Sequence, residues 1–156
     1  MCAAKGVASI RASVLFLIAA LGGCGLGSVA RLGADGQLAT CGSAPHCVSS
    51  LAGDEAHRVD PLRYEGSRAE AHQRLLRTLR ALPRTEVVVD EPRYIRAEAT
   101  STTLRFVDDL EVLLPNEEAS GGLIQVRSSS RLGYSDMGVN RQRVDALRSA
   151  FNGAGP

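Results

Sequence analysis

The passage from Arg127 to Arg143 holds the densest group of side chains that could bind an anion. It combines four arginines with several hydroxyls, two glycines and an asparagine, just ahead of a helical pattern. Free backbone N–H groups and the positive dipole end at a helix start favour an anion, and arginine can grip phosphate or carboxylate bidentately. The side chains that we expect at such a site are Asp108, Arg127, Ser130, Arg131, Tyr134, Ser135, Asn140 and Arg141.

A purely structural interpretation of the same passage stays open. Ser135 or Asp136 would cap the helix, and the glycines would shape the turn before it. The arginines would then pair with the three acids of a preceding strand, which are Asp108, Asp109 and Glu111.

Asp108 is unusual because it interrupts an apolar alternation. In the expected strand over residues 104–114, every second side chain falls on one face: Leu104, Phe106, Asp108, Leu110, Val112 and Leu114. Period-2 geometry turns Asp108 toward the core, where a charge is costly unless it is paired or hydrogen-bonded. With Leu114 opposite Gly122, Asp108 would face Ser128 and Asp109 would face Arg127. Three hypotheses for Asp108 remain. It lies in a bulge, it accepts hydrogen bonds from serines and an arginine in a structural network, or it is a functional acid.

Several chemistries lack their signatures. The chain shows no phosphate-binding loop, dinucleotide fingerprint or nucleophile elbow. Strand alternation separates Asp108 from Asp109 and Glu111, so these acids do not predict a metal site. His57 is expected in a loop and His72 on an ordinary helix face. We therefore predict neither a metal nor a cofactor.

The amino terminus resembles an export signal with a bacterial lipobox, Leu21-Gly22-Gly23-Cys24. Lys5 and Arg11 precede an apolar run over residues 12–21, which is about half the length that a spanning helix needs. Cleavage would leave Cys24 as a lipidated first residue, and Gly25 is not the aspartate that marks inner-membrane retention, which favours the outer membrane. A short uncleaved anchor is the alternative. The segments that we predict are a signal peptide (1–23), a lipidated cysteine and flexible tether (24–40), a folded domain (41–152) and a tail (153–156).

The remaining cysteines fit an exported protein. After cleavage and lipidation, Cys41 and Cys47 are left, and their spacing suits one small disulfide loop in an oxidising compartment. A metal site that includes His46 is the other interpretation, but it lacks a nearby fourth ligand.

Charge and aromatic content argue against nucleic acid as a partner. Without residues 1–23, the count of basic residues falls from 18 to 16 against 17 acidic ones, which gives a formal charge of −1. The mature part has five aromatic residues and no tryptophan, too few for a base-stacking platform.

The elements that must position these residues follow from periodicity and caps. Ser67 and Glu70 form a capping-box pattern, and Pro83 ends the helix that they begin. Strands are expected at residues 59–64, 86–89, 94–100, 104–114 and 123–130, and a second helix at about 138–151. The order β-α-β-β-β-β-α predicts an α+β fold: an antiparallel sheet of about five strands with both helices on one face.

Four segments, at 41–50, 94–98, 106–111 and 128–143, resemble the successive motifs of the bacterial and plastid family called domain of unknown function 1499. The stretch Arg131-Leu132-Gly133-Tyr134-Ser135-Asp136 is the most distinctive. The resemblance covers about residues 41–151 and implies no activity, cofactor or ligand.

The sequence thus favours a non-catalytic cell-envelope lipoprotein, with its domain in the periplasm and its partners an anionic small ligand or an envelope protein. The alternative is an enzyme, such as a hydrolase, that uses Asp108 as general acid or base, with Arg127, Arg131 or Arg141 stabilising a developing anion. That alternative predicts an Asp108 that solvent can reach.

Overall fold

The structure is a computed structural model that describes residues 32–102, 104–117 and 119–154. The signal peptide, Cys24 and the first part of the tether lie outside the described residues. The elements are β1 (Cys47–Ser49), β2 (Leu62–Tyr64), α1 (Arg68–Ala81), β3 (Thr85–Asp90), β4 (Tyr94–Thr100), β5 (Val107–Leu113), β6 (Gly122–Ser130) and α2 (Val139–Gly153).

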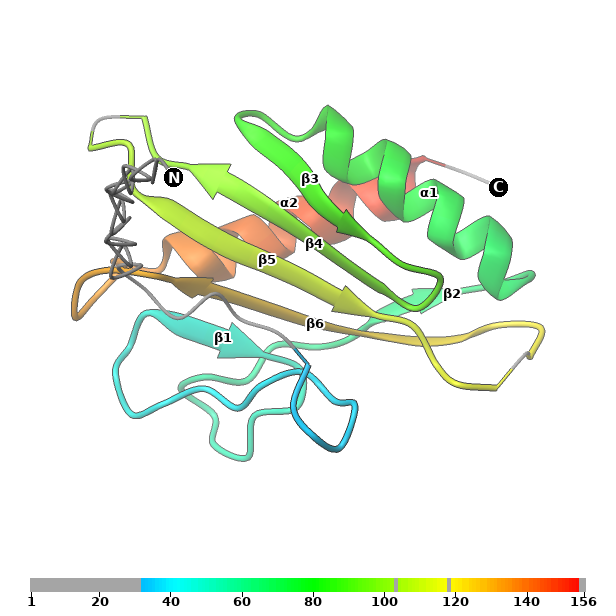
Figure 1. Cartoon of the computed structure of the whole chain (residues 1–156), viewed down its shortest axis with the longest axis horizontal. Helices are drawn as coiled ribbons and strands as arrows, with labels where there is room; N and C mark the ends of the chain where they lie inside the picture. Colours follow the sequence, from blue (N-terminus) through cyan, green and yellow to red (C-terminus); the bar gives the residue numbers. More distant parts are fainter. Residues whose placement is uncertain (1–31, 103, 118, 155–156) are drawn as a thin grey trace, which may run out of the picture.

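In these residues six strands form an antiparallel sheet in the order β1-β6-β5-β4-β3, with β2 paired to the start of β6 (Figure 1). The predicted α+β class is confirmed. The short strand β1 was not predicted, because three residues beside a disulfide loop carry no readable alternation.

Both helices cover the same face of the sheet, as predicted, and Figure 1 shows α2 crossing behind the strands. At the start of α1, Ser67 Oγ accepts from the amide of Glu70 at 3.2 Å, and Glu70 Oε2 accepts from the amide of Ser67 at 2.9 Å. This reciprocal pair is the predicted capping box. The helix ends at Ala81, and Leu82 is extended because Pro83 disfavours helical geometry in the residue before it.

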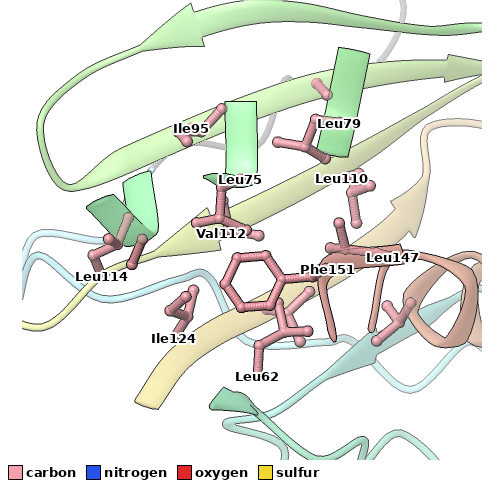
Figure 2. Close-up of a cluster of buried hydrophobic side chains, with 14 of the residues drawn as sticks. Leu62, Leu75, Leu79, Ile95, Leu110, Val112, Leu114, Ile124, Leu147 and Phe151 are labelled. Carbon is pink, nitrogen blue, oxygen red and sulfur yellow. The ribbon is translucent and has the colours of Figure 1, made fainter. Parts of the chain in front are cut away.

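The core lies between the sheet and the two helices. Alternate residues of β4, β5 and β6 point inward and meet the apolar stripes of α1 and α2, and Figure 2 shows the ring of Phe151 among them. The guanidinium carbon of Arg74 lies 4.1 Å from the centre of that ring. Burial of this continuous apolar cluster is the main stabilising term of the fold.

The opposite face of the sheet carries a smaller apolar cluster. Leu38 is buried there against Tyr94 and Leu113, with Leu32 and Val89 at its edge. Side-chain packing onto the sheet therefore begins before residue 41, within the segment that we predict to be the tether (24–40).

Strand β5 is shorter than predicted. Pairing with β4 stops at Thr100 and Val107, and Arg105 has a φ of 53°. The chain then closes a turn in which the amide of Phe106 donates to Ser101 Oγ at 2.9 Å. Because a residue with left-handed backbone angles cannot continue a strand, the strand does not extend through Arg105. Leu104 and Phe106 therefore leave the predicted core face and are exposed.

The predicted register of the last hairpin was wrong by two residues. Asp108 lies opposite Ser130 instead of Ser128, and Asp109 lies opposite Ser129. The first three residues of β6 pair with β2, with Gly122 opposite Tyr64. Since a shift of two residues leaves every side chain on its face, Asp108 still points inward.

Candidate ligand-binding cleft beside the start of α2

Asp108 is 4% exposed and is bound by an arginine from α2. Arg143 Nη2 donates to Asp108 Oδ2 at 2.7 Å, and Arg143 Nη1 donates to Ser128 Oγ at 3.1 Å. Among the three hypotheses for Asp108, these contacts match the structural network. Arg143 could not be chosen over the other arginines from the sequence, because the choice depends on how α2 crosses the sheet.

Asn140 is the centre of this network and is fully buried in the first turn of α2. Its amide nitrogen donates to Ser130 Oγ at 2.9 Å and to the carbonyl oxygen of His46 at 3.0 Å. Its amide oxygen accepts from Ser128 Oγ at 2.6 Å and also from Arg143. The side chain thereby joins α2, β6 and the loop before β1, and both ends of its amide group are occupied.

On the other face of the sheet, Arg127 neutralises the buried Glu111. Arg127 Nη1 donates to Glu111 Oε2 at 2.7 Å, and the hydroxyl of Tyr94 donates to Glu111 Oε1 at 2.6 Å. Burial and the neighbouring carboxylate of Glu111 raise the pKa of Tyr94.

Arg131 similarly neutralises Asp109. Its Nε and Nη2 donate to the two carboxylate oxygens at 2.9 and 2.7 Å, and Arg96 adds a contact of 2.8 Å. Burial alone would raise the pKa of Asp109, but the hydrogen bonds from Arg131 and Arg96 outweigh it, so the pKa is lowered. The hydrogen bond to Asp109 raises the pKa of Arg131 further.

The start of α2 already holds a carboxylate from the protein itself. Asp136 accepts from the amide of Gly138 at 2.9 Å and from that of Asn140 at 2.8 Å. Burial opposes the charge of Asp136, but these amide bonds prevail and lower its pKa. Asp136 thus fills the helix terminus, as the capping interpretation predicted, while Gly138 supplies the left-handed turn with φ 81°.

A cleft of about 460 Å³ lies beside this helix start, between the disulfide loop and the passage before α2. It contains three of the predicted ligand-binding residues, Tyr134, Ser135 and Arg141. Asp108, Arg127, Ser130, Arg131 and Asn140 do not line it. The residues that line it are Ser43, Pro45, Cys47, Val48, Ala56, His57, Tyr134, Ser135, Asp136, Gly138 and Arg141.

Arg141 is the cationic side chain of the cleft. It donates to the carbonyl oxygens of Arg58 at 2.7 Å and of Ala56 at 2.8 Å, which fixes its guanidinium against the wall. Within the part of the chain that the structure describes, Arg141 forms no ion pair, whereas Arg127, Arg131 and Arg143 each bind a buried carboxylate. The one carboxylate that lines the cleft in the described residues, Asp136, accepts from backbone amides of α2 instead of from Arg141.

His57 also lines the cleft, and the sequence did not predict it there. His57 Nδ1 lies 2.7 Å from Asp54 Oδ1, and His57 Nε2 lies 3.4 Å from the carbonyl oxygen of Ala44. The hydrogen bond to His57 lowers the pKa of Asp54. The only signal in the sequence is the i, i+3 spacing of acid and histidine, which is common in loops.

The predicted disulfide between Cys41 and Cys47 is confirmed, and Cys47 forms part of the cleft floor. No three histidine, cysteine, aspartate or glutamate side chains gather as metal ligands in the described ranges. None of the helices in the same ranges is long and apolar enough to cross a membrane.

Comparison with known families supports the resemblance seen in the motifs. Residues 37–151 match the family described as "Protein of unknown function (DUF1499)". The chain belongs to this family, and the match begins just before the buried Leu38. No curated protein matches the sequence.

Proposed function

We propose that this chain is a non-catalytic, lipid-anchored protein of the bacterial cell envelope, and that its domain binds an anionic group in the cleft beside α2. The observation that carries the proposal is the guanidinium of Arg141, which lines a cleft of ligand size and pairs with no carboxylate of the described residues. The binding group belongs to a small molecule or to an envelope protein. Tyr134 supplies an apolar wall and Ser135 a hydroxyl beside that charge.

The proposed location rests on two features. The segment before Cys24 has the composition of a lipoprotein signal, and acylation at Cys24 would anchor the domain in the outer membrane, facing the periplasm. The disulfide between Cys41 and Cys47 fits an oxidising compartment.

The contacts of Asp108 favour binding over catalysis. A general acid or base must reach the substrate, but Asp108 is buried, bound by Arg143 and absent from the cleft wall. Of the three arginines that the enzyme hypothesis offered as anion stabilisers, Arg127 and Arg131 already bind Glu111 and Asp109, and Arg141 lies in the cleft without Asp108.

Native mass spectrometry of the detergent-extracted protein tests the proposal. We expect a co-purified anionic ligand that Arg141→Gln loses and Arg141→Lys partly retains. A charge-assisted hydrogen bond contributes about 1.5–3 kcal/mol, so affinity should fall roughly 10- to 100-fold in Arg141→Gln. Arg148→Gln is the matched control. Arg148 is also on α2 and also donates to a backbone carbonyl oxygen, that of Asp60. Unlike Arg141, it pairs with an acid, Asp145, and lies outside the cleft.

If nothing co-purifies, inorganic phosphate and succinate serve as probes, followed through the amide NMR signals of the cleft. Shifts centred on Arg141 and Tyr134 that vanish in Arg141→Gln support the proposal. Unchanged signals with both anions, or equal binding by Arg141→Gln and Arg148→Gln, overturn it.

A further inference from the structure

Exposed apolar side chains gather at one end of the sheet. The loop before β5 carries Leu104 and Phe106, and the loop after β6 carries Leu132, Tyr134 and Met137. The two loops leave the same end of neighbouring strands, because Asp108 near the start of β5 pairs with Ser130 at the end of β6 (Figure 1). We call these five residues the end patch.

The side chains of the end patch are exposed to solvent. Met137 is 91% exposed, Tyr134 77% and Leu104 66%. Arg105 and Met137 both have left-handed φ angles, of 53° and 54°, which non-glycine residues rarely adopt. A left-handed backbone at a non-glycine residue costs about 1–3 kcal/mol. Exposed apolar side chains that lie together are typical of an interaction surface.

The first loop of the end patch carries a cation. Arg105 stands between Leu104 and Phe106 and has no carboxylate partner in the ranges that the structure describes. The nearest acid along the second loop, Asp136, is held by the amides of α2. Exposed apolar and aromatic side chains, beside an arginine that pairs with no described carboxylate, are suited to the interfacial region of an anionic bilayer.

The tether is long enough to bring the patch to the membrane that would hold Cys24. Leu32 packs against the cluster that contains Leu113, at the opposite end of β5, and this strand is about 23 Å long for seven residues. Eight residue steps separate Cys24 from Leu32, and an extended chain of that length spans at most about 29 Å.

We infer that the end patch docks onto the anionic lipid surface of the bilayer in which Cys24 is anchored. The inference rests on the proposed lipid anchor. Docking orients the domain, and it brings the mouth of the cleft, which Tyr134 also lines, close to the lipid headgroups. Interfacial apolar groups lie about 5–10 Å into the boundary between headgroups and acyl chains, and Met137 is placed to do so.

A single introduced tryptophan tests the docking directly, because the chain has none of its own. The lipidated protein with Met137→Trp is reconstituted into phosphatidylcholine vesicles with and without phosphatidylglycerol. Leu123→Trp is the control, since Leu123 is also exposed but lies at the opposite end of β6. Intact mass reports acylation of Cys24 in each sample.

We expect the emission of Met137→Trp to shift to shorter wavelength in the anionic vesicles and to be quenched by lipids brominated near the headgroup. Leu123→Trp should stay accessible to aqueous iodide. Adding Arg105→Gln to Met137→Trp should reduce the shift, as should high salt.

Acylated protein in which both tryptophans remain equally open to iodide overturns the docking but not the anchor. A mass without acyl groups contradicts the proposed anchor itself. A shift that disappears as the protein is diluted into excess lipid assigns the patch to a second copy of the chain, and a shift that needs an added envelope protein assigns it to that partner; either result overturns docking onto lipid.

Discussion

Arg143 on α2 and Asp108 on β5 face each other across 2.7 Å, in a place where the sheet would otherwise bury an unpaired charge. The pair joins the C-terminal helix to the sheet at the end that carries the cleft. It also explains why an acid can stand in an apolar alternation: the charge is compensated, and the arginine adds bonds to Ser128 and Asn140.

Asp108→Asn should destabilise the domain, because it leaves the guanidinium of Arg143 without its carboxylate. Breaking one side of a buried pair costs about 3–5 kcal/mol. The double variant Asp108→Asn/Arg143→Gln should lose less than the sum of the two single variants, which urea unfolding can measure. Additive losses would show that the two side chains are not coupled.

Asn140→Ala should lower the free energy of unfolding by about 3 kcal/mol, since it leaves several buried polar groups without partners at about 1–3 kcal/mol each. Gln142→Ala, exposed on the same turn of α2, is the control and should change stability by no more than about 0.5 kcal/mol. Equal effects of the two variants would refute the role that we assign to Asn140.

Acid should weaken the domain through Asp109 and Asp136, whose pKa values are lowered in the fold. A group with a lowered folded pKa stabilises above its unfolded pKa, near 3.8 for aspartate, and this contribution is lost as the pH falls below that value. Stability should therefore hold from pH 7 to about 5 and fall below about pH 4. Asp136→Asn should flatten part of that fall; an unchanged profile would mean that Asp136 carries no lowered pKa.

Removal of the disulfide with Cys41→Ser/Cys47→Ser should cost about 2 kcal/mol, as expected for closure of a loop this short. The loop also carries the carbonyl of His46, which accepts from Asn140 and from the amide of Ser130. Hydrogen exchange should therefore rise at Ser130 as well as in the loop. Unaltered exchange at Ser130 would separate the disulfide from the network around Asn140.

Local signals in the sequence were sufficient for much of the fold. The capping box at Ser67 and the stop before Pro83 located α1, and alternation located β4 at residues 94–100. Alternation also predicted that Asp108 points inward. The structural interpretation is confirmed for three of the four arginines, which pair with the acids of β5, while Arg141 pairs with none of them.

The parts that could not be predicted depend on long-range packing. The register of the last hairpin is set where β2 pairs with the first residues of β6, far from β2 in sequence. The cleft brings the loop at Ala56 and His57 beside α2, where Arg141 donates to the carbonyl oxygen of Ala56. No spacing along the chain reports such contacts, so His57 was missed as a cleft residue.

The central claim is that a lipid on Cys24 anchors this domain, and the intact mass of protein extracted from bacterial membranes tests it most directly. The account predicts a chain that begins at Cys24, with the added mass of a diacylglyceryl group and an amide-linked fatty acid, and a Cys24→Ser variant that carries neither acyl group and keeps residues 1–23. A chain that still begins at Met1 and carries no acyl mass would contradict it.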